Sequence, residues 1–147
     1  LYLVDKIPVI TVSQHLEGVA HVFANQLNEN AKTFAEYRVV PELNHHLMEG
    51  LKHPASSDNV LLFLTVQSDL YHPSNKLRLT LTQEVIEQNK LEFLMHRVNE
   101  KSRVAQAFEL LTLGAYTAFY LAMLNNENPI PNPYVDWLKD ELKKRGT

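Results

Sequence analysis

Histidines and carboxylates are concentrated between residues 41 and 49, which read Pro-Glu-Leu-Asn-His-His-Leu-Met-Glu. The segment follows an apolar run and begins with proline, so it predicts the first turn of a helix after a strand. Backbone N–H groups are free there, and a histidine titrates near neutral pH, so His45 and His46 are candidates for acid–base chemistry. The alternative is an exposed helix start with two surface histidines. Glu49 lies one turn after His45, but no third ligand has suitable spacing, so no metal site is predicted.

Two further clusters carry ionisable groups. Residues 28 to 32 read Asn-Glu-Asn-Ala-Lys, and amides on both sides of Glu29 can hold its carboxylate in place as a general base. The alternative is a solvated helix end. Near the chain end, Lys139 lies in a run of charges that is typical of a solvated helix, and its neighbours Trp137-Leu138 leave a packed side chain open as the alternative.

Short β-branched runs alternate with helical spacing along the chain, which predicts the elements that position these clusters. Strand, helix, strand, helix is typical of an α/β domain with a parallel sheet, and such sheets bind ligands beyond the carboxyl ends of their strands. That edge includes Ser13, the turn at Pro41, the loop at Gln67 and the segment after Val98. The sequence predicts four strands and leaves open whether a short fifth strand lies within a segment read as a loop. Strands are expected at 7–12, 34–40, 60–66 and 91–98, and helices at 16–27, 41–50, 74–88, 105–122 and 134–144.

Length and composition exclude several classes of protein. The chain has 147 residues, 45% apolar and 21% charged, with a net charge of −3, which predicts one globular domain and gives no electrostatic reason to expect nucleic acid or an anionic membrane as partner. No apolar run is expected to reach the roughly 20 residues of a membrane span. The absence of cysteine excludes disulfides and thiolate sites, and it fits a cytoplasmic location. The first residues do not resemble a signal peptide, and the missing initiator Met suggests a piece of a longer protein.

Three stretches together resemble one family: residues 27–32, residues 40–45, and the Pro-x-Pro break at 129–131 that leads to Lys139. Their order and spacing are similar to the C-terminal half of the bifunctional phosphoglucose/phosphomannose isomerases, members of the sugar isomerase (SIS) superfamily. The opening residues 6–10 and the helix around 110–116 are similar too. The resemblance implies a flavodoxin-like, three-layer αβα sandwich with a mainly parallel sheet. It also implies that residues 1–147 are a single SIS domain whose N-terminal SIS half is absent.

The family's activity is aldose–ketose isomerisation of hexose 6-phosphates, without metal or organic cofactor. By resemblance, Glu29 matches the carboxylate that moves a proton between sugar C1 and C2 through a cis-enediol(ate). His45 matches the histidine that assists ring opening from the neighbouring subunit, and Lys139 the lysine near the ring oxygen. Asn44 and Ser13 are assigned to substrate binding. A histidine that acts across an interface requires a homodimer.

The chain departs from the family pattern at several places. Nothing matches the N-terminal half that supplies most of the phosphate pocket and an arginine, so the isolated domain is expected to be inactive. The family usually continues Asn-His-Asn-Glu, whereas residues 44–47 read Asn-His-His-Leu. Ile130 stands where a small hydroxyl residue is usual, which favours phosphoglucose over phosphomannose activity. The alternative function is a non-catalytic sugar-phosphate-binding or regulatory SIS module.

Overall fold

Four parallel strands form the centre of the computed structural model, which describes residues 2–146. They are β1 (Ile7–Ser13), β2 (Glu36–Val40), β3 (Leu61–Gln67) and β4 (Glu92–Arg97). The order across the sheet is β2-β1-β3-β4, and every neighbouring pair is parallel. The α/β prediction is therefore confirmed, and the described residues contain no fifth strand.

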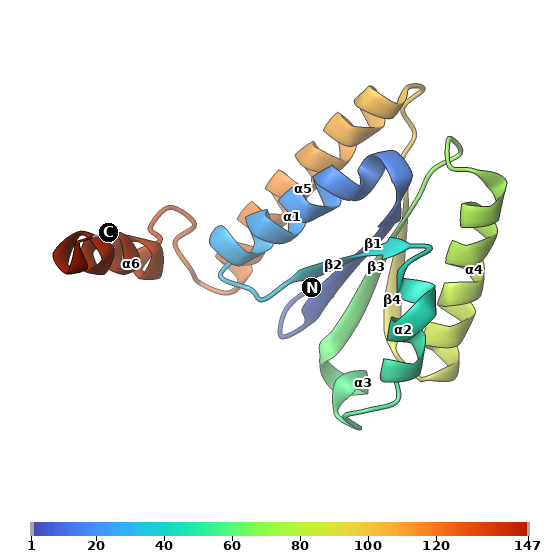
Figure 1. Cartoon of the computed structure of the whole chain (residues 1–147), viewed down its shortest axis with the longest axis horizontal. Coiled ribbons are helices and arrows are strands. Elements are labelled where there is room, and N and C mark those ends of the chain that lie inside the picture. Colours follow the sequence, from blue (N-terminus) through green and yellow to red (C-terminus); the bar gives the residue numbers. More distant parts are fainter. Residues whose placement is uncertain (1, 147) are drawn as a thin grey trace.

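Helices cover both faces of the sheet, which makes the predicted three-layer sandwich (Figure 1). One face carries α1 (Glu17–Glu29) and α5 (Arg103–Leu124), which pack on each other, and the other carries α2 (Leu43–Gly50) and α4 (Pro73–Gln88). Helical segments lie between successive strands, and each following strand enters the sheet in the same direction, as parallel pairing requires. The helical elements are η1 (Gln14–Leu16), α1 (Glu17–Glu29), α2 (Leu43–Gly50), α3 (Ser57–Val60), α4 (Pro73–Gln88), α5 (Arg103–Leu124) and α6 (Pro133–Arg145).

The core follows from the apolar runs in the sequence. β1 is buried almost throughout, because as an inner strand it has a strand on each side and helices on both faces. Phe23 of α1 is fully buried and lies against α5 at Gly114, where any side chain would meet the phenyl ring. This close approach fixes the position of α1, whose last residue is Glu29.

α5 corrects the expectation that no segment is apolar enough to span a membrane. Its 22 residues meet the length and composition of a membrane-spanning helix, with a mean hydropathy of 1.4 in the most apolar window. In this fold, Leu110, Ala118 and Leu121 of the helix are buried in the core with α1. Its other side exposes apolar side chains, including Phe108, Tyr116 and Tyr120.

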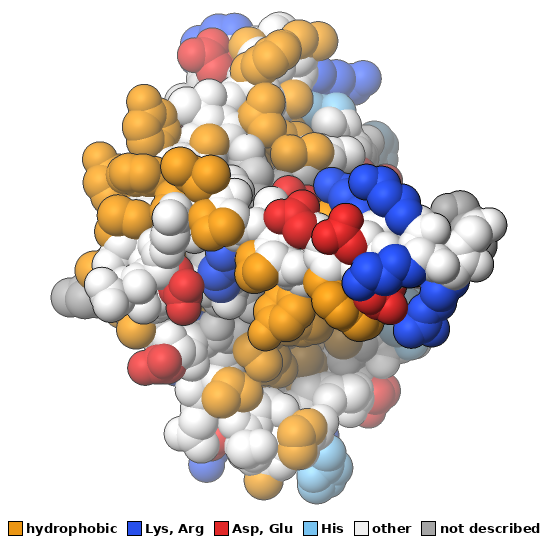
Figure 2. Space-filling model, turned by 90° about the vertical axis from the view of Figure 1, so that its left-hand side faces the viewer, with side chains coloured by type: hydrophobic (Ala, Val, Ile, Leu, Met, Phe, Trp, Pro, Cys, Tyr) orange, Lys and Arg blue, Asp and Glu red, His pale blue; other side chains and the backbone are white. Residues whose placement is uncertain are grey.

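α6 differs from the other long helices because it projects from the domain and buries none of its residues (Figure 1). Apolar side chains gather along one flank of the helix, beneath its charged residues (Figure 2). The alternative of a packed Lys139 side chain is wrong for the single chain, since that side chain is 65% exposed. The exposed apolar side chains of α6 are Tyr134, Val135, Trp137, Leu138 and Leu142.

Candidate active site

Ser13, a predicted substrate contact, lies at the carboxyl end of β1 and is fully buried. Its Oγ donates to Val40 O at 2.8 Å and accepts from Asn75 Nδ2 at 3.0 Å, while its backbone N–H donates to Tyr71 Oη at 3.2 Å. These bonds join β1 to the end of β2 and to the first turn of α4. In a single chain, Ser13 therefore has no surface to offer a ligand.

A buried polar network fills the place where β1 and β3 end. Gln106 Oε1 accepts from Ser68 Oγ at 2.6 Å and lies 2.8 Å from His15 Nε2, and Gln106 Nε2 donates to Glu100 O at 2.8 Å. The ring of Tyr71 packs edge-on against His15 at 5.4 Å, and burial raises the pKa of the Tyr71 phenol above its ordinary value. Protein side chains therefore fill the space between the carboxyl ends of β1 and β3, where ligands of parallel sheets often bind. Sequence reasoning missed Gln106, whose only signal was a polar residue at the start of an apolar helix.

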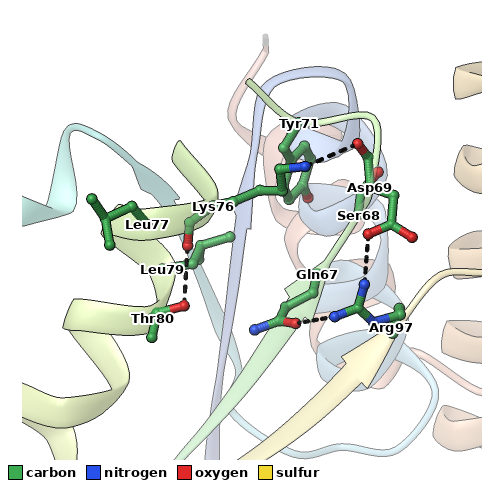
Figure 3. Close-up of a pocket in the computed structure, with 9 residues that line it drawn as sticks. All are labelled: Gln67, Ser68, Asp69, Tyr71, Lys76, Leu77, Leu79, Thr80 and Arg97. Atoms are coloured by element: carbon green, nitrogen blue, oxygen red, sulfur yellow. Dashed lines mark hydrogen bonds and ion pairs between the residues drawn. The ribbon is translucent and has the colours of Figure 1, made fainter. Parts of the chain in front are cut away.

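A hollow of about 210 Å³ lies beside this network, at the carboxyl ends of β3 and β4 (Figure 3). Arg97 and Lys76 both line it, but Arg97 Nη1 is already paired with Asp69 Oδ1 at 2.6 Å and Arg97 Nη2 donates to Gln67 Oε1 at 3.2 Å. Lys76 Nζ reaches the backbone oxygen of Asp69 at 3.4 Å. The loop at Gln67 thus does border a hollow, as the sequence indicated, but none of the predicted catalytic residues lines it.

Asn44 and His45 occupy the first turns of α2, where the sequence placed them. Asn44 Nδ2 donates to Thr82 Oγ1 of α4 at 2.8 Å. The Oδ1 atom of Asn44 is buried and has no hydrogen-bond partner among the described residues. The His45 side chain is exposed, and its imidazole makes no hydrogen bond within residues 2–146. His45 is therefore open to a group outside this chain, and substrate contact by Asn44 stays a prediction.

Glu29 ends α1, and its carboxylate is exposed and has no ion pair within the described part of the chain. Its backbone oxygen accepts a hydrogen bond from Lys32 Nζ at 2.5 Å. The same ammonium donates to Pro131 O at 2.6 Å and to Asn132 Oδ1 at 3.0 Å. The end of α1 is thereby tied to the start of α6, the helix that carries Lys139.

Glu29 and His45 lie at opposite ends of the strands. α1 runs antiparallel to β1, so Glu29 lies near the amino end of β2, whereas His45 follows the carboxyl end of β2. The five residues of β2 span roughly 16 Å at about 3.3 Å per residue. One chain therefore brings Glu29 near the helix of Lys139 but does not bring His45 to them. Within residues 2–146 no three side chains of His, Asp or Glu are grouped to hold a metal ion.

Comparison with known proteins assigns the fold to a family. The family described as "Bacterial phospho-glucose isomerase C-terminal SIS domain" matches residues 1–142. The chain belongs to this SIS domain family.

Curated relatives of the SIS domain are all described as bifunctional phosphoglucose/phosphomannose isomerases. The chain is 32% identical to the one from Thermoplasma volcanium, with 97% of this chain and 45% of that protein covered. It is 30% identical to the one from Caldicellulosiruptor bescii (97% and 42%) and 28% identical to the one from Aquifex aeolicus (94% and 43%). The chain thus spans less than half the length of these relatives.

Solved structures agree with the SIS fold. A glucose-6-phosphate isomerase like protein from Thermus thermophilus superposes with a TM-score of 0.73 at 18% identity, covering 90% of this chain and 44% of that one. Glucosamine-6-phosphate deaminase from Thermotoga maritima superposes with a TM-score of 0.64 at 16% identity, covering 90% and 40%. At these identities the likeness concerns the fold alone.

Proposed function

We propose that the chain is the C-terminal SIS half of an enzyme that interconverts the aldose and ketose forms of hexose 6-phosphates, foremost glucose 6-phosphate and fructose 6-phosphate. The observation that carries the proposal is the exposed carboxylate of Glu29, which has no ion pair among residues 2–146 and lies at a helix end that Lys32 ties to the helix of Lys139. The bifunctional isomerase relatives support the substrate class.

The chemistry requires a carboxylate that removes a proton next to a carbonyl group. A base within hydrogen-bond reach of C1 and C2 can move that proton between the two carbons through a cis-enediol(ate), and Glu29 is the proposed base. Opening of the sugar ring needs an acid and a base at O1 and O5. We assign these steps to His45 and Lys139, which are both exposed; the Lys139 ammonium lies 4.0 Å from Asp136 Oδ1, within an exposed ion pair.

The position of His45 supports an active homodimer. Since β2 separates Glu29 from His45 within one chain, a shared site needs the imidazole from a second copy. Most of the phosphate pocket is assigned to the N-terminal SIS half, because the relatives are more than twice as long as the part that matches. The exposed apolar side chains of α5 and α6 give that half and the second copy surfaces on which to pack.

The first experiment is Glu29→Gln in the full-length protein, with conversion of fructose 6-phosphate to glucose 6-phosphate as the assay. The amide cannot accept the proton, so turnover should fall by about 1,000-fold or more, of the order that general-base removal costs. Glu84→Gln is the matched control, since Glu84 is an exposed carboxylate on α4 with no described partner. Activity of the Glu29 variant within a few-fold of wild type would remove Glu29 as the base. Calorimetric binding of glucose 6-phosphate without turnover by the wild type would instead identify a regulatory module.

A mixed dimer tests the assignment of His45. Neither Glu29→Gln nor His45→Ala homodimers should turn over substrate, but a heterodimer of the two keeps one complete site if each site takes its histidine from the other subunit. About half of the wild-type activity per dimer is then expected. If both groups act within one chain, the heterodimer is as inactive as its parents, which would refute the shared site.

A further inference from the structure

We propose that Lys32 is a positioning residue that fixes Glu29 against the base of α6 and so sets the placement of Glu29 relative to Lys139. The inference rests on the isomerase function proposed above. Lys32 itself touches no reacting atom in this scheme, because its ammonium is occupied by protein groups.

The ammonium of Lys32 uses all of its donor capacity at the junction between the end of α1 and the segment that precedes α6. It has three N–H donors and three acceptors: Glu29 O at 2.5 Å, Pro131 O at 2.6 Å and Asn132 Oδ1 at 3.0 Å. Two of these acceptors lie about 100 residues further along the chain. All three acceptors are neutral oxygens, two of the backbone and one of an amide, and none belongs to the carboxylate of Glu29.

The backbone at Lys32 aims its side chain at this junction. Thr33 N donates to Leu27 O at 3.1 Å, which closes the turn after α1, and Lys32 adopts the left-handed conformation with φ of 53°. Glycine is the usual residue at that position, since a side chain is strained there. Lys32 instead places an ammonium where it reaches both the last carbonyl of α1 and the segment before α6.

Within one chain, the bonds of Lys32 tie the start of α6 to the end of α1, whereas α6 itself buries none of its residues. Asn132 stands at the N-cap position of the helix, yet its side chain does not cap the helix and accepts from Lys32 instead. Loss of the ammonium releases Pro131 and Asn132 from the end of α1. Lys139 follows two turns later, so its distance from Glu29 then varies. A misplacement of about 1 Å costs on the order of 100-fold in rate.

Kinetics of Lys32→Met and Lys32→Arg in the full-length protein test the proposal. Methionine keeps the aliphatic stem without donors, and kcat should fall by about 10- to 100-fold while KM stays within about twofold. Arginine restores donors and should recover most of kcat. Lys101→Met is the matched control, because Lys101 is exposed and has no described bond, and it should behave as wild type. Asn132→Ala removes one acceptor and should give an intermediate loss.

The outcomes separate this inference from the proposed function. If Glu29→Gln abolishes turnover but Lys32→Met stays within twofold of wild type, the positioning role is wrong and the isomerase function stands. A rise in KM at unchanged kcat would overturn it too, since it would make Lys32 a substrate-binding group. If the methionine variant does not fold, Asn132→Ala decides. A wild-type kcat in that variant refutes the positioning role of Lys32, and a lower kcat at an unchanged KM supports it. Retained activity in Glu29→Gln refutes the function itself.

Discussion

Replacing Gly114 by alanine would place a methyl group between two helices that already touch. The added carbon would meet Gln26 Oε1 first and would lie 2.9 Å from the Phe23 ring, whereas carbon atoms in good contact are about 3.5–4.0 Å apart. The buried ring would have to move by roughly 0.6 Å in a packed core, and such overpacking costs about 1–3 kcal/mol. Alanine also improves helix propensity by about 1 kcal/mol. The net expectation is a loss of up to about 2 kcal/mol in the free energy of unfolding.

Urea unfolding followed by far-UV circular dichroism measures this loss. Gly18→Ala is the matched control, because Gly18 is also helical and an added methyl group would meet nothing within 4 Å. That variant should gain about 0.4–1 kcal/mol. The two substitutions thus have opposite expected signs. A Gly114 variant as stable as the Gly18 variant would show that α1 and α5 do not approach as closely as described.

Two further predictions concern buried and terminal hydrogen bonds. Tyr71→Phe orphans the Ser13 N–H and should cost about 1–3 kcal/mol at neutral pH. Burial raises the pKa of Tyr71 in the folded state. Its contribution to the free energy of unfolding is therefore complete below the unfolded pKa of about 10 and declines above it. In urea melts above pH 10, the difference in unfolding free energy between wild type and Tyr71→Phe should become smaller. Ser102→Ala removes the Oγ that accepts from Ala105 N at 3.2 Å and should lower stability by about 1 kcal/mol in the same melts, whereas Ser102→Thr, which keeps a capping hydroxyl, should not.

The sheet could be predicted because each inner strand coincides with a short run of apolar, partly β-branched residues. Residues 7–12 and 60–66 predicted β1 and β3 within a residue or two. The short helix α3 escaped notice, since four residues are too few to show a period. Some strand boundaries differ from the prediction. Phe34 was expected to begin a strand, but its side chain is 61% exposed and β2 begins at Glu36.

The candidate site was less accessible to sequence reasoning. Glu29, His45 and Lys139 were singled out by a family resemblance, and their roles stay predictions. The reach of Lys32 to Pro131 has no local signature, because it joins positions 99 residues apart through a fold that no short pattern specifies. Ser13 shows the same limit: its hydroxyl bonds to Val40 O and Asn75 Nδ2, both distant in sequence, and a substrate contact by Ser13 stays a prediction.

The strand order has a consequence for how this protein is made. β1 pairs with β3, so Ile7 meets Leu61, which leaves the ribosome 54 residues later, and β4 joins only after that. Synthesis runs at about 5–20 residues per second, so the first apolar strand waits some seconds for its inner neighbour. Nascent chains of this topology therefore present unpaired strands to chaperones for longer than a helical bundle of equal size, whose contacts close locally as they emerge.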